Sequence, residues 1–126
     1  MAKKILVVDD NKEVVDLLYK FLSKEGFEVL MSTNGEDALQ LAKRSLPDLI
    51  ILDVMMPGMD GGAVMEKIRE DEKLRDIPVV FLTGAIAEDE ARGREGKDAG
   101  RLFMSKGGDI REQIKIIKKL LMKEAV

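Results

Sequence analysis

Two short apolar runs that end in aspartate constrain the fold of this chain more than any other feature. Residues 5–8 lead directly into Asp9 and Asp10, and residues 49–52 lead into Asp53. A run of four apolar residues between polar ones is typical of a strand buried on both faces of a parallel sheet. The three carboxylates are therefore expected at the carboxyl ends of two core strands, which is the edge where open α/β sheets bind their ligands.

Three carboxylates at one edge repel one another unless a cation lies between them. Because hard divalent ions prefer oxygen ligands, the pattern indicates a divalent metal site. The chain contains no histidine, which excludes His-ligated metal sites, Ser-His-Asp triads and a phosphohistidine of its own. Chemistry at this edge must therefore use carboxylate, hydroxyl and amine groups.

The length and composition predict one soluble domain over residues 1–126, with no output domain. A chain of 126 residues has room for one core, and its net charge of −3 gives no indication of nucleic-acid binding. No apolar run is long enough for a signal peptide or a membrane span. The absence of cysteine is compatible with a reducing compartment, so a cytoplasmic location without membrane attachment is expected.

Strand-like and helix-like segments alternate along the whole chain. The pattern predicts a flavodoxin-like α/β fold, a (βα)5 three-layer sandwich whose five-stranded parallel sheet has the order 2-1-3-4-5. Strands one and three are neighbours in that order, so the three acids would meet. The expected strands are residues 5–8, 28–33, 49–53, 77–83 and 101–106, and the expected helices begin after Asn11 as N-cap, at Glu36, after the turn 56–62 and at Asp109.

Residues 88–100, where the fourth helix should lie, fit this pattern poorly. Eight of these 13 residues are charged and three are glycine. Each interior glycine costs about 1 kcal/mol relative to alanine in a helix, and almost no apolar stripe offsets that cost. We expect a short, frayed or mobile helix, with an ordinary helix held by Ile86 and the alanines as the alternative.

Two further strand ends carry polar residues, Thr83 after the fourth strand and Lys106 after the fifth. Two acids after strand one, one Asp after strand three, Thr after strand four and Lys after strand five form the pattern of response-regulator receiver domains. The chain resembles this family over essentially its whole length, and residues 5–10, 52–61 and 78–83 carry the resemblance. A stand-alone receiver of two-component signalling is therefore expected.

The resemblance implies a phosphoryl-transfer site. Asp53 would accept a phosphoryl group from a phosphohistidine on a sensor histidine kinase or a histidine phosphotransfer protein. Lys106 would pair with Asp53 and then with the phosphoryl group, and the Thr83 hydroxyl would donate to a phosphoryl oxygen. Such a chain switches its contacts with a downstream protein target and is not an enzyme beyond assisting its own phosphorylation and dephosphorylation.

The resemblance also implies Mg²⁺ and a switch. Asp10, Asp53 and the backbone carbonyl of Met55 would bind Mg²⁺ directly, and Asp9 would act mainly through a metal-bound water. Movement of Thr83 toward the phosphoryl group would leave space for Phe103, coupling the site to the outer face. An ordinary core phenylalanine is the alternative for Phe103.

The chain departs from the family pattern on one side. Gly107 and Gly108 stand where proline commonly follows the lysine, and Gly84 replaces a residue that is usually alanine. Glycine allows both loops more conformations. Together with the polar residues 88–100, these departures predict that the side formed by helix four, strand five and helix five is mobile or is ordered only by a partner.

Three other functions share parts of the pattern. A phosphatase of the haloacid dehalogenase type would need a general-acid Asp where Met55 stands. A flavodoxin-like cofactor carrier would need phosphate-binding donors where Asp9 and Asp10 repel a phosphate. A receiver-like protein-binding module that is never phosphorylated stays the main alternative, although such modules usually lack one of the site residues and none is missing here.

Overall fold

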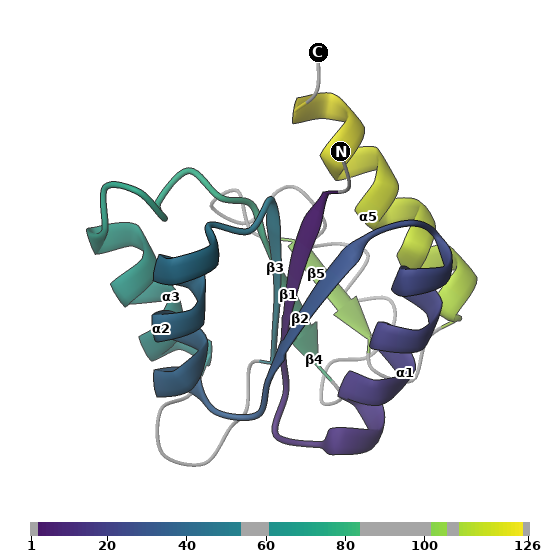
Figure 1. Cartoon of the computed structure of the whole chain (residues 1–126), viewed down its shortest axis with the longest axis horizontal. Helices are drawn as coiled ribbons and strands as arrows, with labels where there is room; N and C mark the ends of the chain where they lie inside the picture. The colour runs from purple at the N-terminus through teal and green to yellow at the C-terminus, as the bar shows by residue number, and fades with distance from the viewer. Residues whose placement is uncertain (1–2, 54–60, 84–101, 106–108, 125–126) are drawn as a thin grey trace.

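The computed structural model describes residues 3–53, 61–83, 102–105 and 109–124 as strands alternating with helices (Figure 1). Each strand has four or five residues, and each helix has at least ten. The strands are β1 (Lys4–Val8), β2 (Glu28–Ser32), β3 (Leu49–Asp53), β4 (Val79–Thr83) and β5 (Leu102–Ser105), and the helices are α1 (Lys12–Lys24), α2 (Gly35–Ser45), α3 (Gly61–Glu70) and α5 (Ile110–Glu124).

The strands form one parallel sheet in the order β2-β1-β3-β4-β5. The predicted flavodoxin-like α/β class is thereby confirmed, including the neighbouring positions of β1 and β3. The expected fourth helix and the polar residues 88–100 lie outside the described residues, so the complete (βα)5 repeat and the predicted mobility of that side stay predictions.

Helices cover both faces of the sheet. In Figure 1, α2 and α3 lie on one side of the strands, and α1 and α5 lie on the other. Side chains alternate along each strand, so Leu6 and Ile50 belong to the α2–α3 core, whereas Ile5 and Ile51 belong to the α1–α5 core. Burial on both faces explains why β1 and β3 are apolar without interruption.

The ends of the helices follow local sequence signals. Asn11 caps α1 as predicted, because its side-chain oxygen accepts a hydrogen bond from the backbone N–H of Glu13 at 3.0 Å. Gly26 follows α1 with a φ of +92°, a conformation that favours glycine. After α2, Leu46 adopts a φ of +48° despite being a leucine.

Some predicted element boundaries were wrong. Strand β2 is one residue and β4 two residues shorter than expected, and β4 begins only after Pro78, which has no N–H to donate. The predicted ends of β5 lie outside the described residues. Helix α2 begins at Gly35, because Asn34 caps it. In α1 the buried stripe consists of Val15, Leu18 and Leu22, and the partly buried Val14 and Phe21 pack against the same core.

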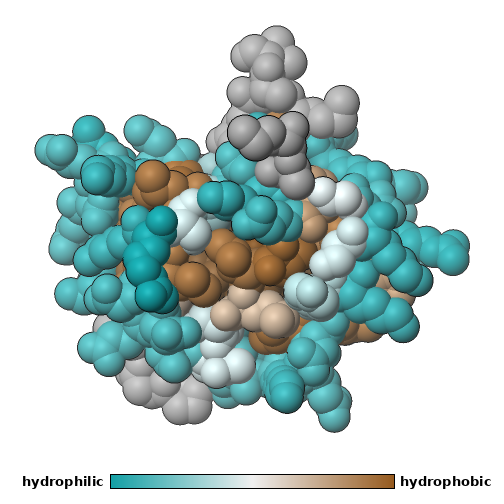
Figure 2. Space-filling view, viewed as in Figure 1, coloured by the Kyte–Doolittle hydropathy of each residue, from teal (hydrophilic) through white to brown (hydrophobic). Residues whose placement is uncertain are grey.

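The edge strand β2 is less covered than the central strands. Figure 2 shows apolar side chains in the middle of the face toward the viewer, where β2 runs in Figure 1. Met31 is 42% exposed, and its neighbours Val29 and Leu30 are only partly buried. Within the described ranges, no helix is both long and apolar enough to cross a membrane.

Candidate functional site

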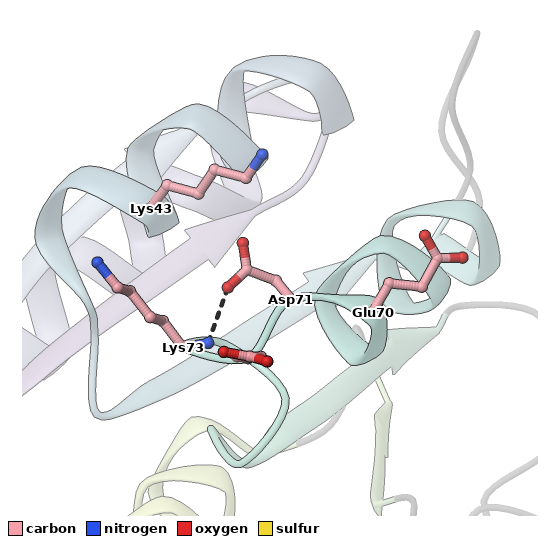
Figure 3. A pocket seen from close by; sticks show the side chains of 5 residues that line it. Lys43, Glu70, Asp71 and Lys73 are labelled. Carbon is pink, nitrogen blue, oxygen red and sulfur yellow. Dashed lines mark hydrogen bonds between the residues drawn. The ribbon is translucent and has the colours of Figure 1, made fainter.

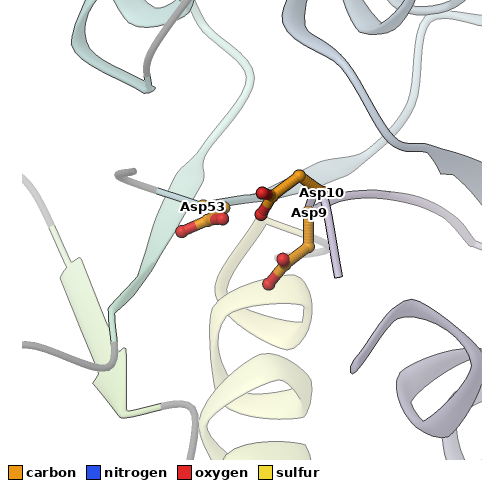
Figure 4. Close-up of side chains that lie close together, drawn as sticks. All are labelled: Asp9, Asp10 and Asp53. Carbon is orange, nitrogen blue, oxygen red and sulfur yellow. The ribbon is translucent and has the colours of Figure 1, made fainter. Parts of the chain in front are cut away.

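Three carboxylates meet at the carboxyl edge of the sheet. Asp9, Asp10 and Asp53 each offer one carboxylate oxygen, and these oxygens all lie within 4.8 Å of one another (Figure 4). Asp9 and Asp53 are 0% and 1% exposed, whereas Asp10 is exposed. The predicted meeting of the three acids is confirmed, and Asp10 is the exposed member of this cluster of described residues.

The sheet register brings these acids together. Val8 of β1 lies beside Leu52 of β3, so the next residue of each chain segment, Asp9 or Asp53, occupies an equivalent place at the strand end. Asp53 is also the last residue of β3 and lies beside Leu82 of β4. Two central strands therefore fix the backbone of the two buried acids.

Backbone groups hold Asp9 in place. Its N–H donates to the carbonyl oxygen of Ser32 at 3.2 Å, which ties the end of β1 to the end of β2. One oxygen of its carboxylate, Oδ1, accepts a hydrogen bond from the backbone N–H of Asn11 at 2.9 Å. The carboxylate is therefore oriented by the start of α1 and cannot turn freely.

Sequence reasoning missed both of these contacts. Asn11 could be predicted as the N-cap of α1, but nothing in the sequence showed that its backbone N–H donates to the Asp9 carboxylate. Ser32 carried no signal, because its contact depends on the β1–β2 register. The Ser32 hydroxyl lies 2.9 Å from the carbonyl oxygen of Asn34 and 3.0 Å from a carboxylate oxygen of Asp37, which links the end of β2 to the start of α2.

The spacing of the acids suits a hard divalent cation. With a metal–oxygen distance of about 2.1 Å for Mg²⁺, two oxygens on one ion lie at most about 4.2 Å apart. The oxygens of the cluster lie within 4.8 Å of one another, so an ion between them could be reached by all three acids, directly or through a bound water. The donor set is all oxygen, which also agrees with such an ion.

The other predicted site residues are described only in part. Thr83 ends β4 one residue beyond Leu82, so its backbone lies at the same edge as Asp53, and Phe103 lies in β5 beside Phe81. The side chains of Thr83 and Phe103 lie outside the described part of the chain, as do Met55 and Lys106 in full. Their roles stay predictions.

A hollow elsewhere on the described part of the chain contains none of the three clustered acids. Its volume is about 480 Å³, and it lies between the last turn of α2, at Lys43, and the segment from Glu70 to Lys73 (Figure 3). The N–H of Lys73 donates to a carboxylate oxygen of Asp71 at 2.8 Å. Because both helices run from the carboxyl edge toward the amino edge, this hollow lies at the opposite edge of the sheet.

Comparisons with known proteins identify the family to which the chain belongs. The family model of the response regulator receiver domain matches residues 5–118. The response regulator PleD of Caulobacter vibrioides is 51% identical over 83 residues, which are 66% of this chain but only 18% of PleD. This chain thus corresponds to less than a fifth of that relative.

Solved structures show the same fold. The chemotaxis protein CheY4 of Vibrio cholerae is 26% identical, with a TM-score of 0.82 and coverage of 95% of this chain and 99% of that one. The signal receiver domain of a signal transduction histidine kinase from Syntrophus aciditrophicus is 32% identical, with a TM-score of 0.81 and coverage of 97% and 92%.

Proposed function

Because the chain belongs to the response regulator receiver domain family, we propose that it accepts a phosphoryl group on Asp53 in a two-component phosphorelay. The observation that carries this proposal is the acid cluster, in which a strand-end Asp53 lies with Asp9 and Asp10 at the ligand-binding edge of the sheet. A buried nucleophile beside two further acids is of use for phosphoryl transfer once a divalent cation offsets their charge.

The proposed donor is a phosphohistidine of a sensor histidine kinase or a histidine phosphotransfer protein. As an oxygen of Asp53 forms a bond to phosphorus, the bond from phosphorus to the histidine nitrogen breaks, and the imidazole leaves with that electron pair. The product is an acyl phosphate on Asp53. Since these 126 residues contain no histidine, the donor histidine must lie outside them.

Mg²⁺ is the proposed cofactor, and when bound it supplies positive charge that offsets the carboxylates and the phosphoryl oxygens. Asp10, Asp53 and the carbonyl of Met55 would hold it directly, and Asp9 would hold it through a water. The exposure of Asp10 supports a direct role for this acid, because an exposed carboxylate can move toward an ion.

The proposed roles of the other site residues follow the pattern of the receiver family. Lys106 would neutralise the phosphoryl group, the Thr83 hydroxyl would bind one of its oxygens, and Phe103 would carry the change to the outer face. The complete (βα)5 fold with a fourth helix belongs to the same proposal. We expect the chain to act by switching its contacts with a downstream protein and not as an enzyme.

Treatment with a small phosphodonor and Mg²⁺, followed by mass spectrometry, tests the proposal. We expect one added phosphoryl group on the wild type and none on Asp53→Asn. Asp16→Asn is the matched control, because Asp16 is an exposed acid on α1 outside the cluster, and it should be phosphorylated like the wild type. Phosphate that persists on Asp53→Asn would move the acceptor elsewhere, and no phosphate on the wild type would favour the binding-module alternative.

A further inference from the structure

Two helices that start at the carboxyl edge are capped in the same way. The side-chain oxygen of Asn11 accepts from the N–H of Glu13 at 3.0 Å, and that of Asn34 accepts from the N–H of Asp37 at 2.8 Å. The two caps differ in what precedes them. Asn11 directly follows the acids Asp9 and Asp10, whereas Asn34 starts α2 and belongs to no acid cluster within the described residues.

Asn11 is held to α1 on several sides. Besides the cap bond of its side chain, its carbonyl oxygen accepts from the N–H of Val14 at 3.1 Å and from that of Val15 at 3.2 Å. These bonds fix the orientation of the whole residue, including its own N–H. That N–H donates to Oδ1 of Asp9 at 2.9 Å, so the first turn of α1 helps to orient the Asp9 carboxylate.

We infer that Asn11 is a positioning residue for the metal site: by capping α1 it holds Asp9 in the orientation in which that carboxylate joins Asp10 and Asp53. The inference rests on the proposed function, because it concerns the same cation. Asn11 touches the acid through its backbone, and its side chain acts by keeping that backbone in place.

Loss of the cap should loosen this arrangement. Without its side-chain acceptor, the N–H of Glu13 loses its partner and the first turn of α1 frays. The N–H of Asn11 then moves, and Asp9, which is 0% exposed, loses a fixed donor at a place where little water can replace it. Mutation of a group that hydrogen-bonds to a metal ligand typically lowers the metal affinity by about 10- to 100-fold. The Asn11 side chain affects Asp9 only indirectly, through the position of its own backbone N–H. We therefore expect a loss of Mg²⁺ affinity at the lower end of that range.

If the cap of α1 affects Mg²⁺ binding, Mg²⁺ binding must also affect the cap. An ion that binds Asp9 and Asp10 better in the native orientation favours the state in which the first turn of α1 is formed, and the coupling is reciprocal. Bound Mg²⁺ should therefore protect the N–H of Glu13, which bonds to the Asn11 side chain. The N–H of Asp37 in the other cap should be protected much less.

Mg²⁺ titration calorimetry on the full chain tests the inference with four variants. Asn11→Ala should weaken Mg²⁺ binding about tenfold, and Asn11→Ser, which can still cap, should bind nearly as tightly as the wild type. Asn34→Ala is the matched control: it should lower the thermal unfolding midpoint about as much as Asn11→Ala and leave the Mg²⁺ affinity unchanged. Asp53→Asn reports on the proposed site itself and should lose most of the affinity.

The outcomes separate the inference from the proposed function. Equal Mg²⁺ affinities for Asn11→Ala, Asn34→Ala and the wild type would overturn the inference and leave the metal site standing. The inference would also fail if Asn11→Ser bound as weakly as Asn11→Ala, because capping would then not be the cause. A wild type that binds no Mg²⁺ would overturn both. Hydrogen exchange at Glu13, measured with and without Mg²⁺, gives a second readout independent of phosphorylation.

Discussion

At the scale of single residues, the three carboxylates act against the stability of the fold that holds them. Like charges within 4.8 Å repel one another, and burial of Asp9 and Asp53 removes much of the water that would screen them. A sequence selected only for stability would not keep this arrangement. The arrangement lowers the stability of the fold, as is common where a ligand such as a cation or a phosphoryl group has to bind.

Asp10→Asn should therefore stabilise the metal-free protein. Asparagine has nearly the same shape as aspartate, and Asp10 is exposed, so the change removes one charge from the cluster with little effect on packing. We expect the free energy of unfolding in urea with EDTA to rise by about 0.5–2 kcal/mol.

Asp16→Asn provides the comparison for this stability change. Asp16 is also exposed, but it lies outside the cluster, so its removal should change the free energy of unfolding by less than about 0.5 kcal/mol. A lower stability of Asp10→Asn than of the wild type would show that repulsion within the cluster is not the dominant effect at this position.

At the scale of elements, the strands and helix ends that could be predicted are those determined by the sequence of the segment itself. β1 and β3 are buried on both faces, so their apolar runs had no competing interpretation. The acids at their ends could be expected to meet because parallel neighbours end at one edge. The cap at Asn11 also has a local cause, since an asparagine side chain reaches the second N–H of the helix it precedes.

The parts that could not be predicted depend on contacts between distant segments. The bond from Asp9 to Ser32 depends on the register between β1 and β2, which no single segment encodes. That Val15 is buried more completely than Val14 depends on how α1 is rotated against the sheet. Strand ends such as that of β4 depend on where a neighbour stops pairing.

Gly26 gives a prediction at the end of α1. Its φ of +92° is a conformation that side chains with a Cβ rarely adopt, and a Cβ added there would meet nothing within 4 Å. Gly26→Ala should therefore lower the free energy of unfolding through the backbone alone, by about 1 kcal/mol. Chemical denaturation measures this loss, and the exposed Ser23→Ala one turn earlier serves as control with little expected change. An unchanged stability of Gly26→Ala would mean that the turn can relax.

At the scale of the whole molecule, the site lies at the ends of two strands that belong to the central core. The order β2-β1-β3-β4-β5 places β1 and β3 inside the sheet, and helices cover them on both faces. Backbone amides in such strands exchange mainly through global unfolding. A ligand at the ends of β1 and β3 should therefore stabilise the entire fold and not only a local loop, which distinguishes this site from the hollow beside Lys43 at the opposite edge.

Mg²⁺ should accordingly raise the global stability by an amount set by its affinity. At a free concentration 100 times the dissociation constant, binding to the native state alone adds about 2.7 kcal/mol to the free energy of unfolding. Urea unfolding should show a higher midpoint with an unchanged slope, because the surface exposed on unfolding stays the same. Asp10→Asn should lose most of this gain while remaining the more stable protein in EDTA. If Mg²⁺ raised the urea midpoints of Asp10→Asn and the wild type equally, the ion would be binding away from the cluster. The claim that a ligand at the cluster stabilises the entire fold would then be wrong.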